Sequence, residues 1–336
     1  MFKQASEGII YKSRDFISMT VREIRKNPFT GEWVIFSEIR QERPDRDKAF
    51  CPLCTGSEEV PSFTKPLRIS NKYPALSSEV EYKKYKHGEF LEKMTGHGNC
   101  ELLVYTDKHQ SKFIDMPTEE INQIFEKWIQ ATKELAKGSS IKYVLPFENY
   151  GTDVGATLIH PHGQIYAFPF IPNLLKKEFD TIVEYKKKKN QCMICNYIDQ
   201  EQAKDERIIY QNQHLTALIP YFAKYAYDVR IYPQRHVSYL HQCTRIEMVE
   251  MTEVILKLIR ALNQILEMEI SYSLSLHQGP VNTPDSMASH MYFKLHTPQR
   301  NTQSRKLLGA VETSGDTYIN GILPETAAAQ LKDILM

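Results

Sequence analysis

The segment His160-Pro-His162-Gly-Gln164 places three side chains that can do chemistry within one short stretch. Residues two apart on a strand point to the same face, so we expect these side chains to lie side by side. His160 could bind a metal ion, while His162 presents a free imidazole. If a hydrogen bond holds one ring nitrogen of His162, the other nitrogen is left as a nucleophile. The Gln164 amide can donate to a phosphoryl oxygen without acting as a base. The simpler alternative is a strand-end turn with surface histidines.

Two Cys-x-x-Cys pairs are typical of metal sites. A structural zinc ion takes four cysteine or histidine ligands at tetrahedral corners, and each pair supplies two of them. Histidines from adjacent strands can complete each set. The predicted ligands of the first ion are Cys51, Cys54, His109 and His160, and those of the second ion are Cys192, Cys195, His236 and His290. We therefore expect zinc, with two ions per chain.

Two alternatives to these metal sites stay open at the level of sequence. All four cysteines could surround a single zinc ion if the two pairs meet in space, but this leaves the histidines unexplained. Each histidine, taken alone, could also be an ordinary core or surface residue. Cys100 and Cys243 have no partner in the two-site scheme, and we interpret them as ordinary residues.

The elements that must position these residues occur as an internal repeat, with the same order of cysteines, strands, helix and histidines in each half of the chain. Corresponding cysteines are 141 residues apart, and corresponding histidines are 127 and 130 residues apart. The β-rich, alternating run 101–109 parallels 228–236. A helix follows each run, because apolar residues recur at helical spacing in 121–135 and in 248–266. Each helix would bury one face against a sheet, which predicts a layered α+β fold. A further helix is expected in the linker, over 174–189.

The two copies differ at the segment 160–164, here called the chemical segment. The second copy retains the metal histidine at His290, but Tyr292 and Lys294 stand where the first copy has His162 and Gln164. We infer that the first copy does chemistry and the second copy supports it.

Composition narrows the class of protein. The chain has 336 residues, about two domains' worth, and its 11% aromatic content excludes a disordered or fibrous protein. Its 42 basic and 41 acidic residues give a formal charge of +1, so no nucleic acid partner is expected. No apolar run is long enough to span a membrane, so no membrane partner is expected. Four of its six cysteines are paired as Cys-x-x-Cys and no secretion signal is apparent, which predicts a cytoplasmic protein with metal sites.

The residues around the chemical segment resemble a known family. Phe147-Glu-Asn149-Tyr-Gly151, followed by the run from Thr157 through His162 to Ala167, closely resembles the signature of the galactose-1-phosphate uridylyltransferase family. This family is the transferase branch of the histidine-triad superfamily. Further matches lie in 27–33, 40–44, 71–75 and 305–312, so the resemblance covers about residues 20–335.

The resemblance implies a duplicated histidine-triad fold of class α+β. Strands of both halves would form one mostly antiparallel, half-barrel-like sheet, with helices packed outside. Residues 1–19 would be an N-terminal extension, 20–173 the first, catalytic repeat, and 174–336 the second repeat. The family is commonly dimeric, so a homodimer is expected.

The resemblance also implies an activity, that of a UDP-glucose–hexose-1-phosphate uridylyltransferase of galactose metabolism. His162 would attack the α-phosphorus of UDP-glucose and expel glucose 1-phosphate. Galactose 1-phosphate would then take UMP from the uridylyl-histidine in a ping-pong reaction. Hydrolytic relatives carry a third histidine where this chain has Gln164, so transfer is favoured over hydrolysis. The family's first zinc ion uses positions that match Cys51, Cys54, His109 and His160.

Substrate-binding roles carry over by position. Arginine forks suit phosphate oxygens, and asparagine and threonine can contact the nucleotide and its phosphates. The implied residues are Arg40 and Arg43 for phosphate or nucleotide, Asn71 and Asn149 for the nucleotide, Thr157 for phosphate, and Lys306 and Glu312 for the hexose. The alternatives are a solvated basic turn, ordinary turn asparagines and surface charges.

Some features depart from the best-known bacterial pattern. Tyr292 stands where some members have a metal-binding histidine, Thr157 replaces a serine, and the tail 312–320 lacks the glutamine expected near the hexose. Glu178 and His277 match an older iron-type ligand set, but the cysteine set is more complete. The tail looks more like that of nucleotide-sugar phosphorylases.

Two other functions therefore stay open. The nearest is a nucleoside-diphosphate-sugar phosphorylase of the ADP-glucose type, which would also use His162. An alternative of another class is a non-catalytic zinc-dependent binding module, since a small basic run, Lys186–Lys189, lies beside the second cysteine pair.

Overall fold

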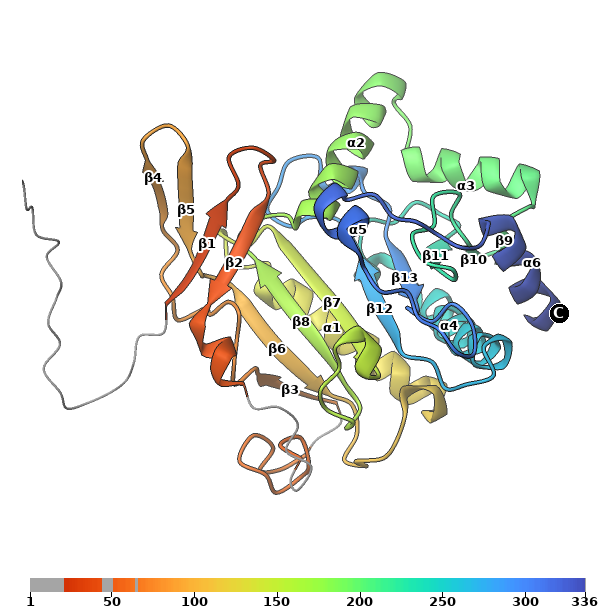
Figure 1. Ribbon diagram of the computed structural model, residues 1–336, viewed down its shortest axis with the longest axis horizontal. Helices are drawn as coiled ribbons and strands as arrows, with labels where there is room; N and C mark the ends of the chain where they lie inside the picture. Colours follow the sequence, from red (N-terminus) through yellow and green to blue (C-terminus); the bar gives the residue numbers. More distant parts are fainter. Residues whose placement is uncertain (1–20, 44–50, 64–65, 336) are drawn as a thin grey trace, which may run out of the picture.

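The computed structural model describes residues 21–43, 51–63 and 66–335, so the predicted extension 1–19 lies outside the described part (Figure 1). Its centre is a nine-stranded antiparallel sheet. In spatial order the strands are β3 (Leu67–Ser70), β6 (Asn99–Val104), β8 (His162–Phe168), β7 (Tyr143–Tyr150), β12 (Tyr272–His277), β13 (Tyr292–His296), β11 (Val229–Pro233), β10 (Leu215–Leu218) and β9 (Ile208–Gln211).

The two copies of the sequence pattern join edge to edge in this sheet. β7 of the first half pairs with β12 of the second, with Asn149 opposite Ser273 and Phe147 opposite Ser275. Outward from this seam the order is β7-β8-β6 on one side and β12-β13-β11 on the other. Corresponding strands of the two halves therefore follow one another in opposite directions from the seam. The predicted α+β class with a mostly antiparallel sheet is confirmed.

Three helices cover one face of the sheet (Figure 1). They are α1 (Thr118–Leu135), α4 (Arg245–Ile265) and α6 (Pro324–Leu335). The predicted helices 121–135 and 248–266 are thus confirmed, and α4 begins with a capping box made by Thr244 and Glu247. Trp128 of α1 stacks on Phe293 of β13, with ring centroids 6.3 Å apart. This contact joins the two halves through one continuous apolar core.

Two further helices pack on the opposite face in the second half. The predicted linker helix is α2 (Asn173–Lys189), and α3 (Met193–Lys204) follows it. Ile182 of α2 and Ile194 of α3 belong to an apolar cluster with Leu218, Tyr232 and Tyr292 of the sheet. Helices therefore lie on both faces of the second half.

A second, four-stranded sheet lies beside the first half and was not predicted. Its order is β2 (Trp33–Ser37), β1 (Arg22–Lys26), β5 (Leu91–Thr95) and β4 (Lys84–His87). It packs through Ile24 and Met94 against Phe168 and Phe170 at the end of β8. It therefore supports the strand that carries the chemical segment.

The remaining short helices lie in loops. They are η1 (Glu38–Glu42), η2 (Phe113–Asp115), η3 (Thr152–Val154), η4 (Leu240–Gln242), η5 (Ser286–Ala288) and α5 (Ala310–Gly315). Among the described residues, no helix combines the length and the apolar character that a membrane crossing requires.

The strand assignment of two histidines needs correction. His160 and His290 were expected within strands, but β8 begins at His162 and β13 begins at Tyr292. In the first half the residue in between is Pro161, which has no N–H to donate to a strand ladder. Each metal histidine therefore sits in the loop just before its strand.

Candidate functional site

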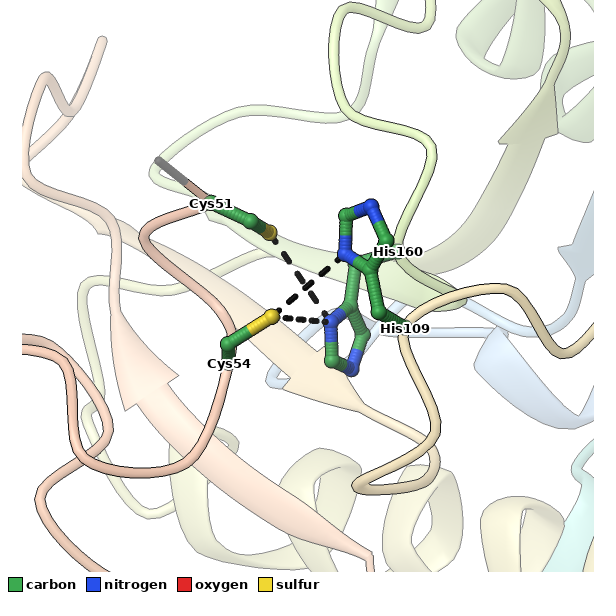
Figure 2. Close-up of side chains that lie close together, drawn as sticks. All are labelled: Cys51, Cys54, His109 and His160. Atoms are coloured by element: carbon green, nitrogen blue, oxygen red, sulfur yellow. Dashed lines mark hydrogen bonds between the residues drawn. The ribbon is translucent and has the colours of Figure 1, made fainter. Parts of the chain in front are cut away.

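The first Cys2His2 cluster gathers four side chains from three separate loops. Cys51 and Cys54 lie in the loop before β3, His109 follows β6, and His160 precedes β8. Figure 2 shows all four pointing toward one another. Cys54 Sγ lies 3.4 Å from His109 Nδ1 and 3.6 Å from His160 Nδ1, and Cys51 Sγ lies 3.8 Å from His160 Nδ1.

These distances fit a tetrahedral metal ion. Zinc–sulfur bonds of about 2.3 Å and zinc–nitrogen bonds of about 2.0–2.1 Å place sulfur and nitrogen about 3.6 Å apart at tetrahedral corners. His160 is fully buried, and its Nε2 lies 2.7 Å from the Thr106 carbonyl oxygen. A carbonyl can only accept, so Nε2 carries the proton and the Nδ1 lone pair faces the cysteines.

The second cluster repeats this arrangement. Cys195 Sγ lies 3.3 Å from His290 Nδ1 and 3.9 Å from His236 Nδ1. The Nε2 atoms of these histidines lie 3.0 Å and 3.1 Å from backbone carbonyl oxygens, which again leaves Nδ1 free to bind. Cys192 completes the set and caps α3 by accepting from the Cys195 N–H.

The eight predicted ligands therefore form two groups, and each group can hold a metal ion. Within each set the ligand atoms all lie within 4.8 Å of one another. The single-ion alternative with four cysteines is not what the described side chains form. All six cysteines are free of disulfides, as metal ligation requires.

His162 is the first residue of β8 and is half-buried. Its Nδ1 lies 2.8 Å from the His160 carbonyl oxygen, so Nδ1–H donates and Nε2 keeps its lone pair. Burial lowers the pKa of His162, and the nearby Arg43 charge acts in the same direction, while the hydrogen bond to the His160 carbonyl opposes them; the net effect favours the neutral ring. The imidazole is therefore oriented and unprotonated at the nitrogen that could attack.

Gln164 and Asn149 share the sheet face of His162. Gln164 is two residues further along β8 and pairs with Phe147 of β7, and Asn149 is two residues beyond Phe147. Gly163 lies between His162 and Gln164 in the chain and faces the opposite side of the sheet. A Cβ at Gly163 would come within 2.3 Å of the Tyr105 hydroxyl oxygen, so the strand packs closely enough there to require glycine.

Of the other predicted phosphate and nucleotide residues, Arg43 lies close enough to affect His162, and Arg40 lies close to Tyr166 of the same strand. Arg43 donates through Nη2 to the Thr157 hydroxyl. Arg40 donates to the Tyr73 carbonyl at 3.4 Å, and the Asn71 side-chain oxygen accepts from the Tyr73 N–H at 2.9 Å. Asn71 thus closes its own turn, while its amide nitrogen is available for other contacts.

The two predicted hexose residues, Lys306 and Glu312, are paired with each other. Their side chains are almost fully buried and form an ion pair of 2.8 Å. Its hydrogen bond to Lys306 lowers the pKa of Glu312 to about 2. Lys306 also donates to the Ile319 carbonyl, which closes the segment after β13. None of their described hydrogen bonds or ion pairs reaches His162.

Sequence reasoning missed a buried acid below the site. Glu148 is 3% exposed and accepts from the Tyr272 hydroxyl at 2.8 Å. Burial raises the pKa of Glu148 to about 8. Within the described part of the chain, the buried Tyr105 hydroxyl and the second oxygen of Glu148 have no hydrogen-bond partner. The available signal was an acidic residue at an inward position between Phe147 and Asn149 in an alternating strand.

Comparison with known proteins agrees with this geometry. The sequence model described as galactose-1-phosphate uridyl transferase, N-terminal domain, matches residues 13–172, and that for the C-terminal domain matches residues 178–335. The chain belongs to the galactose-1-phosphate uridyl transferase family. The family assignment covers both halves of the nine-stranded sheet.

Individual relatives of this family align over nearly the whole chain. The galactose-1-phosphate uridylyltransferase of Thermotoga maritima is 35% identical over 313 residues, which cover 93% of this chain and 98% of the relative. A solved uridylyltransferase structure has a TM-score of 0.83 at 29% identity and covers 93% of this chain and 98% of its own. The ADP-glucose phosphorylase of Arabidopsis thaliana is 25% identical and covers 93% of each chain.

Proposed function

We propose that the protein is a UDP-glucose–hexose-1-phosphate uridylyltransferase that moves UMP from UDP-glucose to galactose 1-phosphate. The observation that carries this proposal is the state of His162. Its Nδ1 proton is held by the His160 carbonyl, and its Nε2 lone pair lies on the same open face as Gln164. An oriented, neutral imidazole of this kind is suited to covalent nucleotidyl transfer.

The reaction consists of two balanced displacements at phosphorus. The Nε2 lone pair of His162 attacks the α-phosphorus of UDP-glucose, a P–N bond forms, and the P–O bond to glucose 1-phosphate breaks with its electron pair on the leaving oxygen. A phosphate oxygen of galactose 1-phosphate then attacks the same phosphorus and the P–N bond breaks. Throughout, Nδ1 of His162 keeps its proton and donates it in a hydrogen bond to the His160 carbonyl oxygen, which stabilises the cationic ring of the intermediate.

Gln164 explains the preference for transfer over hydrolysis. Its amide donates to a non-bridging phosphoryl oxygen, and it cannot remove a proton from water as a histidine could. The uridylyl-histidine therefore waits for a sugar phosphate. Arg43 and Thr157, already in contact, would hold phosphate oxygens, and Arg40, Asn71 and Asn149 would hold the nucleotide.

The two Cys2His2 clusters fit zinc, and we propose two zinc ions per chain. When bound, zinc supplies a cross-link between loops, not reaction chemistry. Cys51, Cys54 and His109 would fix His160, whose carbonyl in turn orients His162. Lys306 and Glu312 would contact the hexose, in a cytoplasmic homodimer.

A phosphorylase is the second candidate, because the Arabidopsis ADP-glucose phosphorylase aligns with 93% of the chain. It would use the same nucleotidyl-histidine but pass the nucleotide to inorganic phosphate. The relatives reported above are all named as enzymes, which favours both catalytic candidates over a non-catalytic zinc-binding module.

The test is incubation with UDP-glucose labelled in the uridine part, followed by addition of an acceptor. We expect acid-labile, base-stable label on the protein that galactose 1-phosphate removes as UDP-galactose. Removal by inorganic phosphate alone would establish the phosphorylase. No covalent label from either UDP-glucose or ADP-glucose would contradict both proposals.

A further inference from the structure

A cavity of about 380 Å³ lies in the second half, away from His162. Its lining residues come mainly from α2, α3, β11 and β13, whose places in the fold are labelled in Figure 1. Its volume is within the ~300–1,000 Å³ that small-molecule sites occupy. Aromatic rings line much of its wall, from Tyr197, Phe222, Tyr232 and Tyr292. No step of the proposed reaction uses it.

Arg230 of β11 is the unusual group in this wall. Its guanidinium carbon lies 4.8 Å from the ring centroid of Phe222 and 4.7 Å from that of Tyr292. Its Nη1 donates to the Tyr232 hydroxyl at 3.4 Å. Among the described residues no carboxylate forms an ion pair with it, and its buried Nε has no hydrogen-bond partner. Arg230 lines the cavity and is only partly buried, so its terminal nitrogens can bind an anion there.

The charges around the cavity leave Arg230 as its unpaired cation. Lys177 and Lys224 lie 3.3 Å and 3.8 Å from Asp316, and Lys294 lies 3.6 Å from Asp228. The remaining carboxylate of the lining, Glu178, accepts from the Tyr292 hydroxyl at 3.0 Å. Among the described lining residues, Arg230 is therefore the cation left to pair with a bound anion.

The position of the cavity relates it to the catalytic face. Tyr292 and Lys294 follow the metal histidine His290 by two and four residues, as His162 and Gln164 follow His160. The Tyr292 hydroxyl donates a hydrogen bond to the Glu178 carboxylate. Unlike histidine, tyrosine has no ring nitrogen that could attack phosphorus. The second half thus keeps a cleft at the corresponding place without the nucleophile.

We propose that this cavity binds a phosphate monoester of a ring compound, a nucleoside monophosphate or a hexose phosphate, without reacting with it. Arg230 and Lys294 hold the phosphate, and the rings of Phe222 and Tyr197 contact the organic part. The second repeat is then a ligand-binding site separate from the catalytic one.

The test counts bound ligand in the full-length, zinc-loaded protein by equilibrium dialysis. The probes are labelled 5′-UMP, glucose 1-phosphate and inorganic phosphate, each with wild type, Arg230→Gln and Phe222→Ala. The control is Arg245→Gln, which removes the same charge from an exposed arginine on α4. We expect Arg230→Gln to bind one fewer molecule of UMP or glucose 1-phosphate per chain. Phe222→Ala should weaken the same site about 3- to 10-fold, and Arg245→Gln should match wild type.

Zinc content and the label exchange between glucose 1-phosphate and UDP-glucose should stay at wild-type level in all variants. The label exchange tests the proposed function. The number of ligands bound per chain tests the cavity, so the two proposals can fail separately. If Arg230→Gln loses zinc or its thermal transition, the exposed Phe222→Ala decides. Unchanged binding in Phe222→Ala, or equal affinity for inorganic phosphate and both esters, would overturn the proposal.

Discussion

At the scale of single residues, the proposed function assigns different roles to two neighbouring histidines. His160 Nδ1 faces the two cysteines, and the His160 carbonyl oxygen accepts a hydrogen bond from Nδ1 of His162. The Nε2 atom of His162 keeps its lone pair. Proximity in sequence therefore does not mean equivalence in function. The two rings can be separated by substitution because each has its own readout, zinc content for one and covalent label for the other.

We expect His162→Gly to lower the exchange between labelled glucose 1-phosphate and UDP-glucose by several orders of magnitude, because the nucleophile is gone. Zinc content and the thermal midpoint should stay close to wild type, and an imidazole-linked uridylyl donor could restore transfer by filling the vacated space. His160→Gly is the matched control and should lose one zinc ion and stability. Equal zinc loss in both variants would show that ligand and nucleophile are assigned wrongly.

A second residue-scale prediction concerns Glu148. Its folded-state pKa of about 8 lies above the ordinary carboxyl value of 4.5, because burial disfavours the charged form. Between these values the folded state binds more protons than the unfolded state, so Glu148 lowers stability as pH rises from about 5 to 8. Glu148→Gln removes this loss, and its stability relative to wild type should rise over that range by up to about 3–5 kcal/mol.

Thermal or urea unfolding of Glu148→Gln and wild type at several pH values measures this difference. The exposed Glu253→Gln on α4 is the control and should track wild type at every pH. A stability difference that stays constant from pH 5 to pH 8 would mean that Glu148 is ionised in the folded protein.

At the scale of elements, loops around the strand β8 link metal binding to catalysis. The loop 51–63 packs through Leu53 and Val60 on Leu102 and Val104 of β6, the neighbour of β8. We expect wild type to hold two zinc ions and Cys51→Ser and Cys192→Ser to lose one each. Cys51→Ser should also lose stability and label, because a structural metal contributes folding energy and here fixes His160.

Elemental analysis with Cys243→Ser as the control measures this, since Cys243 lies outside both clusters and should leave two zinc ions. A Cys51→Ser protein with full zinc content would remove the first site. A Cys192→Ser protein with full zinc content would remove the second.

Gly163 gives a further prediction for β8. A Cβ there would meet the Tyr105 hydroxyl at 2.3 Å and the Phe147 carbonyl oxygen at 3.2 Å. We expect Gly163→Ala to destabilise the protein by about 1–3 kcal/mol and to reduce covalent label, because β8 must shift. Adding Tyr105→Phe removes the obstructing hydroxyl and should recover part of both losses. Equal stability of wild type and Gly163→Ala in urea unfolding would contradict the close packing.

The sequence predicted some elements well because their signals are periodic or repeated. The helices α1, α2 and α4 have apolar stripes at helical spacing, and both metal clusters follow from matching offsets of cysteines and histidines. α3 was missed because only Ile194, Ile198 and Glu201 of its residues are buried. The four-stranded sheet was missed because its strands are short and few of their residues are buried; all of Lys84–His87 is exposed.

The candidate site was predictable for the same reason, up to a limit. The predicted metal ligands and His162 stand in short motifs or at matching offsets, and the structure brings each predicted ligand set together. The buried Glu148 accepts from Tyr272, which is far away in sequence and comes near it only through the pairing of β7 with β12. Such contacts carry no local pattern.

At the scale of the whole molecule, the two halves share one sheet and one core. β7 pairs with β12 along the seam, Trp128 stacks on Phe293, and Thr252 of α4 donates to Asn122 of α1 at 2.8 Å. The first half contains His162 and a complete Cys2His2 cluster, so its chemistry is local. Its stability is not, because β7 and one face of α1 are completed by the second half.

We therefore expect a fragment of residues 1–173 to lack a cooperative thermal transition and covalent label from UDP-glucose. Its β7 would become an unpaired edge, and the apolar residues of α1 that contact the second half would be exposed. Co-expression with residues 174–336 should restore both properties, because the fragment pair can rebuild the β7–β12 seam; the intact chain is the control. A fragment 1–173 that unfolds cooperatively and accepts label would show that the catalytic repeat is an independent domain and that the seam joins two self-sufficient units.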